Sequence, residues 1–154
     1  MEPKQVVLCP QHLSNSEAAA FPLAGLTAYR ALFTKGQVTK DTKLLITGIG
    51  GGVGLAALIL AVAAGVEVWV TSSSEKKIER AKKLGAKGGI LYTTPNWSRE
   101  LKKDCGELDV VLDSAGGDIC THAVPLLKQG GTIVTYGMTL GPKTPFTMQA
   151  VLKV

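Results

Sequence analysis

The chain has 154 residues, a length that fits one ordinary domain and excludes a second catalytic domain of the usual size. Hydrophobic residues make up 45% of it and charged residues 19%, which provides apolar material for a packed globular core and excludes a disordered chain. Seventeen Lys and Arg against 12 Asp and Glu give a net charge of +5. This mild basic surplus suits a phosphate-bearing ligand, nucleic acid or simple solubility equally well.

Residues 1–40 are predicted to be a helical lead-in to the main domain. Ser14 and the residues after it offer N-cap side chains for a first helix. Residues 26–33, which follow Pro22, have the apolar spacing of a second helix that ends before Gly36. We therefore expect two helices in this segment, the second of them after the proline.

From residue 41 to residue 154, short apolar segments alternate with helical patterns. Strands are predicted at residues 43–47, 67–71, 89–92, 108–113 and 131–136, and helices at residues 53–64, 75–84, 98–105 and 119–128, the last despite Pro125. Such an alternation implies right-handed βαβ crossovers. The predicted fold class is α/β, a Rossmann-type, doubly wound parallel sheet with helices on both faces. Because an apolar run stops at Val154, we expect the last strand to be cut short, as in a truncated chain or a gene fragment.

The sequence contains no segment typical of export or of membrane insertion. Residues 1–10 match neither a signal peptide nor a transit peptide. The uncharged stretch at residues 44–66 is interrupted by glycines. The uninterrupted helix-forming segment that follows them has about 12 residues, fewer than the roughly 20 that a membrane span requires. The three cysteines have no paired spacing. These features predict a cytoplasmic location and no membrane partner.

A glycine-rich segment at residues 47–54 (TGIGGGVG) joins the first buried strand to the next helix. Glycines at this place let the turn be tight and let backbone N–H groups approach an anionic diphosphate, towards which the positive end of the helix dipole points. The simpler interpretation is a glycine-rich turn without a ligand. The position between a strand and a helix favours diphosphate binding.

The register of these glycines leaves several ligand classes open. Gly48, Gly50 and Gly52 suit a methyltransferase loop, and Gly48 also matches the loop of short-chain dehydrogenases. Methyltransferases and ordinary NAD enzymes place an acidic residue at the end of the second strand to hold ribose hydroxyls, whereas this strand ends in Thr-Ser-Ser-Ser. The catalytic Tyr-x-x-x-Lys of short-chain dehydrogenases is absent, because no tyrosine is followed by lysine four residues later.

Hydroxyl and ammonium groups follow the second predicted strand. Ser73 and Ser74 precede Lys76 and Lys77, at the place where the 2′-phosphate of NADPH would sit, so this segment favours NADPH over NADH. In the alternative interpretation, one of the serines caps the helix that begins at Glu75, and the lysines form a solvated helix face.

Six segments occur in an order that is typical of one enzyme family. They are residues 18–32 (AAAFPLAGLTAYRAL), the glycine loop, and residues 71–77, 84–86, 112–117 and 127–131. In the loop, Gly51 and Gly54 take the last two fingerprint positions and Ile49 stands at the first. The chain therefore resembles the cofactor-binding domain of the medium-chain dehydrogenase/reductase superfamily, the zinc-binding or alcohol-dehydrogenase-like enzymes. Ile49 is typical of its quinone-oxidoreductase-like branch and favours the zinc-independent enzymes.

This resemblance implies an NADPH-binding domain that sits beside a separate, mostly β catalytic domain in an enzyme that passes hydride to a quinone, an enone or a related carbonyl compound. By position in the family, the residues expected to contact the cofactor are Gly51, Gly52 and Val53 at the diphosphate, Ser73 and Lys77 at the 2′-phosphate, Tyr92 near the adenosine, and Ser114, Gly137, Met138 and Thr27 on the nicotinamide side. No residue is a convincing proton donor, so the chain alone is expected to bind cofactor with little or no turnover. The alternative is a non-catalytic nucleotide-binding or interaction module.

The sequence predicts no metal site in this chain. Cys9 and His12 have the spacing of one ligand pair, but structural zinc takes four ligands, and the remaining cysteines and His122 lack complementary spacing. The basic helix at residues 75–83 has no interleaved aromatic residues, so nucleic acid is not an expected partner. Family members often dimerise through the last strand, and the resemblance is compatible with a homodimeric parent protein. Asp113 ends a strand at the functional edge, where a structural hydrogen bond and a ligand contact both remain open.

Overall fold

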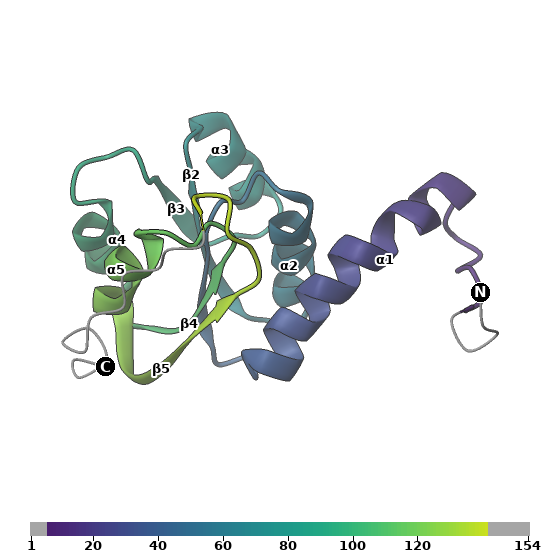
Figure 1. Ribbon diagram of the computed structural model, residues 1–154, viewed down its shortest axis with the longest axis horizontal. Helices are drawn as coiled ribbons and strands as arrows, with labels where there is room; N and C mark the ends of the chain where they lie inside the picture. Colours follow the sequence, from purple (N-terminus) through teal and green to yellow (C-terminus); the bar gives the residue numbers. More distant parts are fainter. Residues whose placement is uncertain (1–5, 142–154) are drawn as a thin grey trace.

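The computed structural model describes residues 6–141 (Figure 1). Its five strands are β1 (Lys43–Ile46), β2 (Glu67–Ser72), β3 (Gly88–Leu91), β4 (Leu108–Asp113) and β5 (Leu127–Thr135). All neighbouring strands pair in parallel, in the order β3-β2-β1-β4-β5. The chain thus builds the sheet outwards from β1 to β3 and then crosses to the other side of β1. This confirms the predicted Rossmann-type sheet, whose ligand crevice is expected at the carboxyl ends of β1 and β4.

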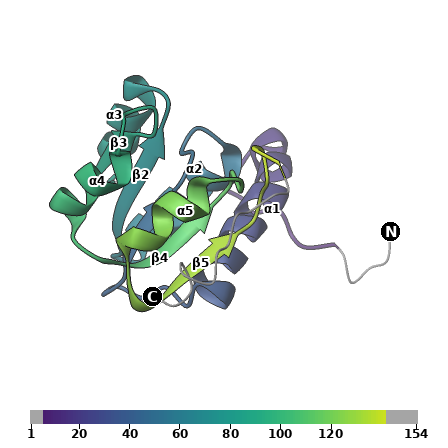
Figure 2. The same cartoon turned by 60° about the vertical axis from the view of Figure 1, so that its left-hand side comes forward.

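Helices cover both faces of the sheet. The helical elements are α1 (Asn15–Tyr29), the π-helix η2 (Arg30–Lys35), α2 (Gly52–Ala63), α3 (Glu75–Lys83), α4 (Trp97–Cys105), α5 (Ile119–Ala123) and the 3₁₀ turn η3 (Val124–Leu126). Successive residues of a strand enter opposite cores, as the strand pleat requires: Leu44 and Ile46 pack with α1, α2 and α3, whereas Leu45 packs with α4 and α5. In the turned view of Figure 2, α5 lies in front of the strands and α1 behind them.

One continuous helix, α1, runs through Pro22, where two helices were predicted. That prediction was wrong. A proline removes a single backbone hydrogen bond of the helix, and this loss is offset because both ends of α1 are held by other groups. At the start, Ser14 and Glu17 form a capping box, in which the Glu17 carboxylate accepts from the Ser14 N–H at 2.9 Å. At the end, Ala28 is buried in the core, and the helix continues directly into η2. Figure 1 shows that the N-terminal part of α1 projects away from the sheet.

The strand β5 begins at Leu127, four residues before the predicted strand and inside the predicted helix 119–128. The prediction missed the effect of Pro125, which lies in the 3₁₀ turn η3, so the α-helix ends at Ala123. Leu127 already pairs with Leu108 of β4, and a register shift follows before Thr132 pairs with Val110. The apolar run at residues 150–154, where we expected a shortened last strand, lies outside the described residues.

Within residues 6–141, every helix is too short or too polar to cross a bilayer. The longest uncharged helix, α2, has 12 residues, compared with the roughly 20 of a membrane span. It is instead buried along one side against the sheet, through Ala57, Leu58 and Ala61. The prediction of strand, loop and helix for residues 44–66 is confirmed, but the helix is buried along one face only, since Ile59 is 50% exposed.

Candidate functional site

The glycine loop is tied to the end of β2. Gly48 has a φ of +64°, a conformation that glycine adopts without steric cost. Its N–H donates to the Thr71 hydroxyl at 3.2 Å, and the N–H of Ile49 donates to the Thr71 carbonyl at 3.0 Å. The side chain of Ile49 is buried in the core between the sheet and α2. Thr71 therefore sets the path of the loop across the carboxyl edge of the sheet.

The helix α2 begins at the end of this loop without an acidic residue in its first turn. Gly51 is its N-cap, and the first hydrogen bond of the helix runs from the N–H of Leu55 to the Gly51 carbonyl at 3.0 Å. The N–H groups of Gly52, Val53 and Gly54 precede that bond and so have no carbonyl acceptor within the helix. A Cβ built on Gly51 would meet nothing described within 4 Å. The start of α2 is thus open to an anion, which the helix dipole attracts.

The side chain of Lys77 reaches back from α3 over this loop. Its Nζ lies 2.6 Å from the position that a Cβ on Gly50 would occupy, so any larger residue there would displace the ammonium group. Ser73 and Lys77 line the same cleft. Ser74 is the N-cap of α3, but its side chain makes no capping hydrogen bond to the described backbone, and its N–H donates to the Ser72 hydroxyl at 3.1 Å.

A buried carboxylate joins the ends of β1 and β4. Asp113 is fully buried; its Oδ1 accepts from the Thr47 hydroxyl at 3.0 Å and from the N–H of Ala115 at 2.9 Å, and its Oδ2 accepts from the N–H of Gly116 at 2.9 Å. The N–H of Ser114 donates to the Thr47 hydroxyl at 3.1 Å. Asp113 therefore has a structural role: it shapes the turn that presents Ser114 at the edge of the sheet.

These elements border one cleft of about 760 Å³ along the carboxyl edge of the sheet. Five of the ten residues predicted to contact a cofactor line it: Gly51, Ser73, Lys77, Tyr92 and Ser114. They come from the loop before α2, from α3 and its entry, and from the segments after β3 and β4. The structure therefore brings together residues that are up to 63 positions apart in the sequence.

The other five predicted residues lie beside the cleft or away from it. Gly52 and Val53 form the first turn of α2. Gly137 follows β5, and a Cβ there would lie 2.5 Å from the Ser114 carbonyl oxygen, while Met138 is exposed in the same loop. Thr27 lines a separate hollow on α1, and its hydroxyl donates to the Leu23 carbonyl at 2.7 Å.

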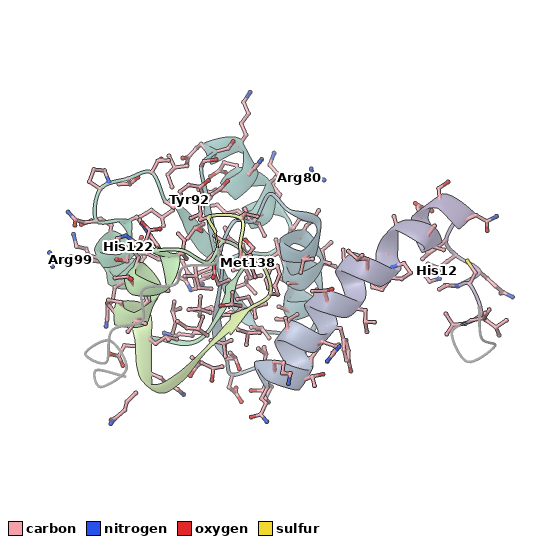
Figure 3. The ribbon with its side chains drawn as sticks, viewed as in Figure 1. His12, Arg80, Tyr92, Arg99, His122 and Met138 are labelled. Atoms are coloured by element: carbon pink, nitrogen blue, oxygen red, sulfur yellow. The ribbon has the colours of Figure 1, made fainter. Side chains whose placement is uncertain are left out.

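A second flank of the cleft was not identified from the sequence. It includes Asn96, Trp97, Asp118, Ile119 and His122, from the start of α4, the residue before α5 and α5 itself. The rings of Trp97 and His122 lie 5.9 Å apart, and Asn96 has a φ of +55°. Figure 3 shows Tyr92 and His122 on the side of α4 and α5, and Met138 in the loop nearer α2. No spacing motif marks these residues. The one signal in the sequence is general: a helix that follows a parallel strand begins at the carboxyl edge of the sheet, which places the starts of the predicted helices 98–105 and 119–128 there.

The described residues do not fit a metal ion. Among the described side chains of residues 6–141, which do not include that of Cys120, no three His, Cys, Asp or Glu gather closely enough to hold one. Cys9 is exposed before α1, whereas Cys105 is buried at the end of α4, and burial raises the pKa of its thiol. A buried protonated thiol is a poor metal ligand.

The sequence model of the family described as "Zinc-binding dehydrogenase" matches residues 52–153. The zinc-type alcohol dehydrogenase-like protein YogA of Leptosphaeria maculans is 46% identical over 97% of this chain and 44% of its own length.

Solved structures show the same similarity. A crystal structure of an NAD-dependent alcohol dehydrogenase has a TM-score of 0.87 and 32% identity, over 96% of this chain and 43% of the other. The quinone oxidoreductase of Thermus thermophilus, solved also in complex with NADPH, has a TM-score of 0.79 and 32% identity, over 96% of this chain and 46% of the other. The chain thus spans less than half the length of each of these relatives.

Proposed function

The chain belongs to the zinc-binding dehydrogenase family of the medium-chain dehydrogenase/reductase superfamily, and we propose that it binds NADPH for an enzyme that reduces a quinone, an enone or a related carbonyl compound. Its fold and matched segment are those of the nicotinamide-dinucleotide-binding domain of that superfamily. We further propose that residues 1–40 lead in from a catalytic domain and that residues 41–154 form the dinucleotide-binding domain.

The start of α2 under the Lys77 ammonium group carries this proposal. Two anionic groups of a dinucleotide phosphate need two separate sources of positive potential. The first is the set of N–H groups at Gly52 and Val53, which suits the diphosphate. The second is Lys77, whose Nζ lies over Gly50 and whose helix α3 starts beside the exposed Ser73. The presence of both sources at the same edge of the sheet supports a ligand with a diphosphate and a further phosphate.

The charge of the cleft favours NADPH over NADH. The strand β2 ends in Thr71 and Ser72, with hydroxyls where NAD enzymes have a carboxylate for the ribose. Arg80 and Lys77 share a small hollow of about 80 Å³ beside Gly50, which adds a second cation near the proposed 2′-phosphate. Both cations would attract a phosphate, and neither is needed by a ribose with two free hydroxyls.

The remaining residues are assigned by their position in or beside the cleft, and Thr27, which lies away from it on α1, by the resemblance to the superfamily alone. We propose that Tyr92 and the flank of Asn96, Trp97 and His122 hold the adenosine half. Ser114, Gly137, Met138 and Thr27 are proposed to lie on the nicotinamide side, where the cofactor supplies the hydride when bound. The protein then contributes orientation of the two reactants. No residue in this chain is assigned as a proton donor.

Calorimetric titration of the folded chain with NADPH and NADH tests the proposal. Lys77→Gln is expected to weaken NADPH binding by about tenfold or more, the loss of one charge-assisted hydrogen bond, while NADH binding stays unchanged. Lys76→Gln is the matched control, because Lys76 is the neighbouring exposed lysine outside the lining of the cleft. Equal effects of Lys77→Gln on both dinucleotides would contradict the 2′-phosphate assignment.

Two further outcomes separate the alternatives. A folded chain that binds neither NADPH nor NADH would overturn the proposed function and favour a structural or interaction module. Binding of S-adenosylmethionine in place of either dinucleotide would favour a methyltransferase-like ligand.

A further inference from the structure

A buried tyrosine hydroxyl lies behind the wall of the cleft. Tyr136 follows β5, and its N–H donates to the Asp113 carbonyl at 2.9 Å. Its ring packs against the core formed with α1, α2 and α3. The Tyr136 Oη is buried and has no hydrogen-bond partner among residues 6–141. A buried polar group without a partner is uncommon in proteins, and where one occurs, a functional reason is a leading explanation.

The neighbours of this hydroxyl belong to the site already described. Burial raises the pKa of Tyr136; the Ser114 hydroxyl nearby acts in the opposite direction, and the charge of Asp113 raises the pKa further. The strands place the two residues side by side: Asp113 pairs with Thr135, so Ser114 and Tyr136 follow as neighbours, and a Cβ on Gly137 would lie 2.5 Å from the Ser114 carbonyl oxygen. The two hydroxyls nevertheless do not have the geometry of a hydrogen bond. Tyr136 is a neutral donor at physiological pH, with its proton available to an acceptor.

Ser114 is the side chain that can connect Tyr136 to the cleft. It lines the cleft, and its Oγ donates to the Thr47 carbonyl at 3.2 Å, a long bond for two oxygen atoms. A Cβ on Gly48 would lie 2.8 Å from this Oγ, so the hydroxyl sits directly beneath the glycine loop. A serine hydroxyl has one donor and two acceptor lone pairs. It can therefore donate to one group and accept a hydrogen bond from Tyr136 at the same time.

We propose that Tyr136 is a positioning residue that acts through Ser114: its hydroxyl donates to Ser114 Oγ when Ser114 turns from the Thr47 carbonyl to a polar acceptor of the nicotinamide half of the cofactor. The inference rests on the proposed function, since it needs a dinucleotide in the cleft. In the free protein the Tyr136 hydroxyl has no hydrogen-bond partner among the described residues, and in the complex it donates to Ser114. Removing the hydroxyl should therefore weaken binding without destabilising the free protein.

The test uses Tyr136→Phe, Ser114→Ala and the double variant of the full 154-residue chain, titrated with NADPH and with adenosine 2′,5′-bisphosphate. The bisphosphate carries the adenosine and the 2′-phosphate but lacks the nicotinamide half. Tyr136→Phe is expected to weaken NADPH binding about three- to tenfold, the range of one neutral hydrogen bond, and to leave bisphosphate binding unchanged. The double variant should bind NADPH no more weakly than Ser114→Ala, because the two residues act in series. The melting temperature of ligand-free Tyr136→Phe should equal or exceed that of the wild type.

Each other result counts against the proposal. Unchanged NADPH binding by Tyr136→Phe, equal weakening of both ligands, or additive effects in the double variant would overturn it while the proposed function stands. Wild-type protein that binds neither ligand would overturn the proposed function as well.

A measurement on the wild type covers the case in which the phenylalanine variant does not fold. The tyrosine Cζ resonances are recorded with ¹³C-labelled tyrosine, and Tyr136 is assigned by elimination from Tyr29→Phe and Tyr92→Phe. NADPH should shift the Tyr136 resonance and the bisphosphate should not. The same shift with both ligands, or with neither, would overturn the proposal.

Discussion

Removing the carboxylate of Asp113 should loosen the carboxyl ends of β1 and β4. The variant Asp113→Ala leaves three donors without their acceptor: the Thr47 hydroxyl and the N–H groups of Ala115 and Gly116. Each hydrogen bond to a charged acceptor contributes about 1.5–3 kcal/mol. Because the three bonds share one carboxylate, their losses are not additive, and we expect a total decrease of about 3–5 kcal/mol in the free energy of unfolding.

Urea unfolding followed by circular dichroism measures this loss. With a slope of about 2 kcal/mol per M, the unfolding midpoint should fall by about 2 M. Asp113→Asn should lose less, because its oxygen can keep the bonds to Thr47 and Ala115 while its amide group faces the N–H of Gly116. Asp41→Ala is the control, since Asp41 is exposed in the turn before β1. A midpoint shift below about 0.5 M for Asp113→Ala would refute the structural role of this carboxylate.

Three further variants test other parts of the fold. Gly88→Ala places a Cβ against the ring of Trp69, so its free energy of unfolding should fall by about 1–3 kcal/mol in urea. Burial would raise the pKa of Asp109, but hydrogen bonds from Lys128 and from the backbone of β1 hold it below its ordinary value. The stability that the Asp109 carboxylate adds is therefore fully present above the unfolded-state pKa of about 3.9 and is lost as the pH falls through the lower folded-state pKa. The variant Asp109→Asn lacks this contribution, so its melting temperature should decrease less on acidification than that of the wild type. Pro22→Ala restores a backbone donor inside α1 and should stabilise the helix by about 1–3 kcal/mol, seen as slower amide exchange in its first half.

Each of these variants has a matched control or a result that contradicts it. Gly51→Ala adds a Cβ in open space and loses only the preference for glycine over alanine at an N-cap, so its free energy of unfolding should fall by less than about 1 kcal/mol. As the control for Asp109→Asn, Asp104→Asn removes an exposed carboxylate at the end of α4 and should leave the decrease in melting temperature on acidification unchanged. If the melting temperatures of the wild type and Asp109→Asn decreased equally on acidification, Asp109 would add no pH-dependent stability. Unchanged exchange rates in Pro22→Ala would show that the proline does not limit α1.

The strands and most helices of this fold could be predicted from the sequence because their signals are local. The apolar run at residues 43–46 and the alternation that follows it need no tertiary information. The start of β5 could not be found in this way. The helix predicted for residues 119–128 runs past Pro125, which marks the end of the α-helix. The pairing of Leu127 with Leu108, a partner 19 residues earlier, makes the residues that follow a strand. Long-range pairing overrides local preference there.

The cleft residues show the same difference: some have a local signal in the sequence, and others are placed only by tertiary packing. Ser73 and Lys77 follow a strand in a way that sequence reasoning recognises, and the structure places both at the cleft. Asp118 and His122 have no such signal, because they reach the cleft only through the way α5 packs over β4. Tyr136 was passed over for a related reason: its hydroxyl is significant because of what surrounds it, and a sequence does not show which polar atoms are buried.

The central place of β1 in the sheet affects how the chain folds during synthesis. Leu45 pairs with Trp69 on one side and with Val111 on the other. The first partner leaves the ribosome about two dozen residues after β1, but the second follows only after some forty more. At translation rates of about 5–20 residues per second, one edge of this apolar strand stays uncovered for a few seconds. The nascent chain is therefore most exposed to misassociation between the emergence of β2 and that of β4, and a pause in translation there would lengthen the interval.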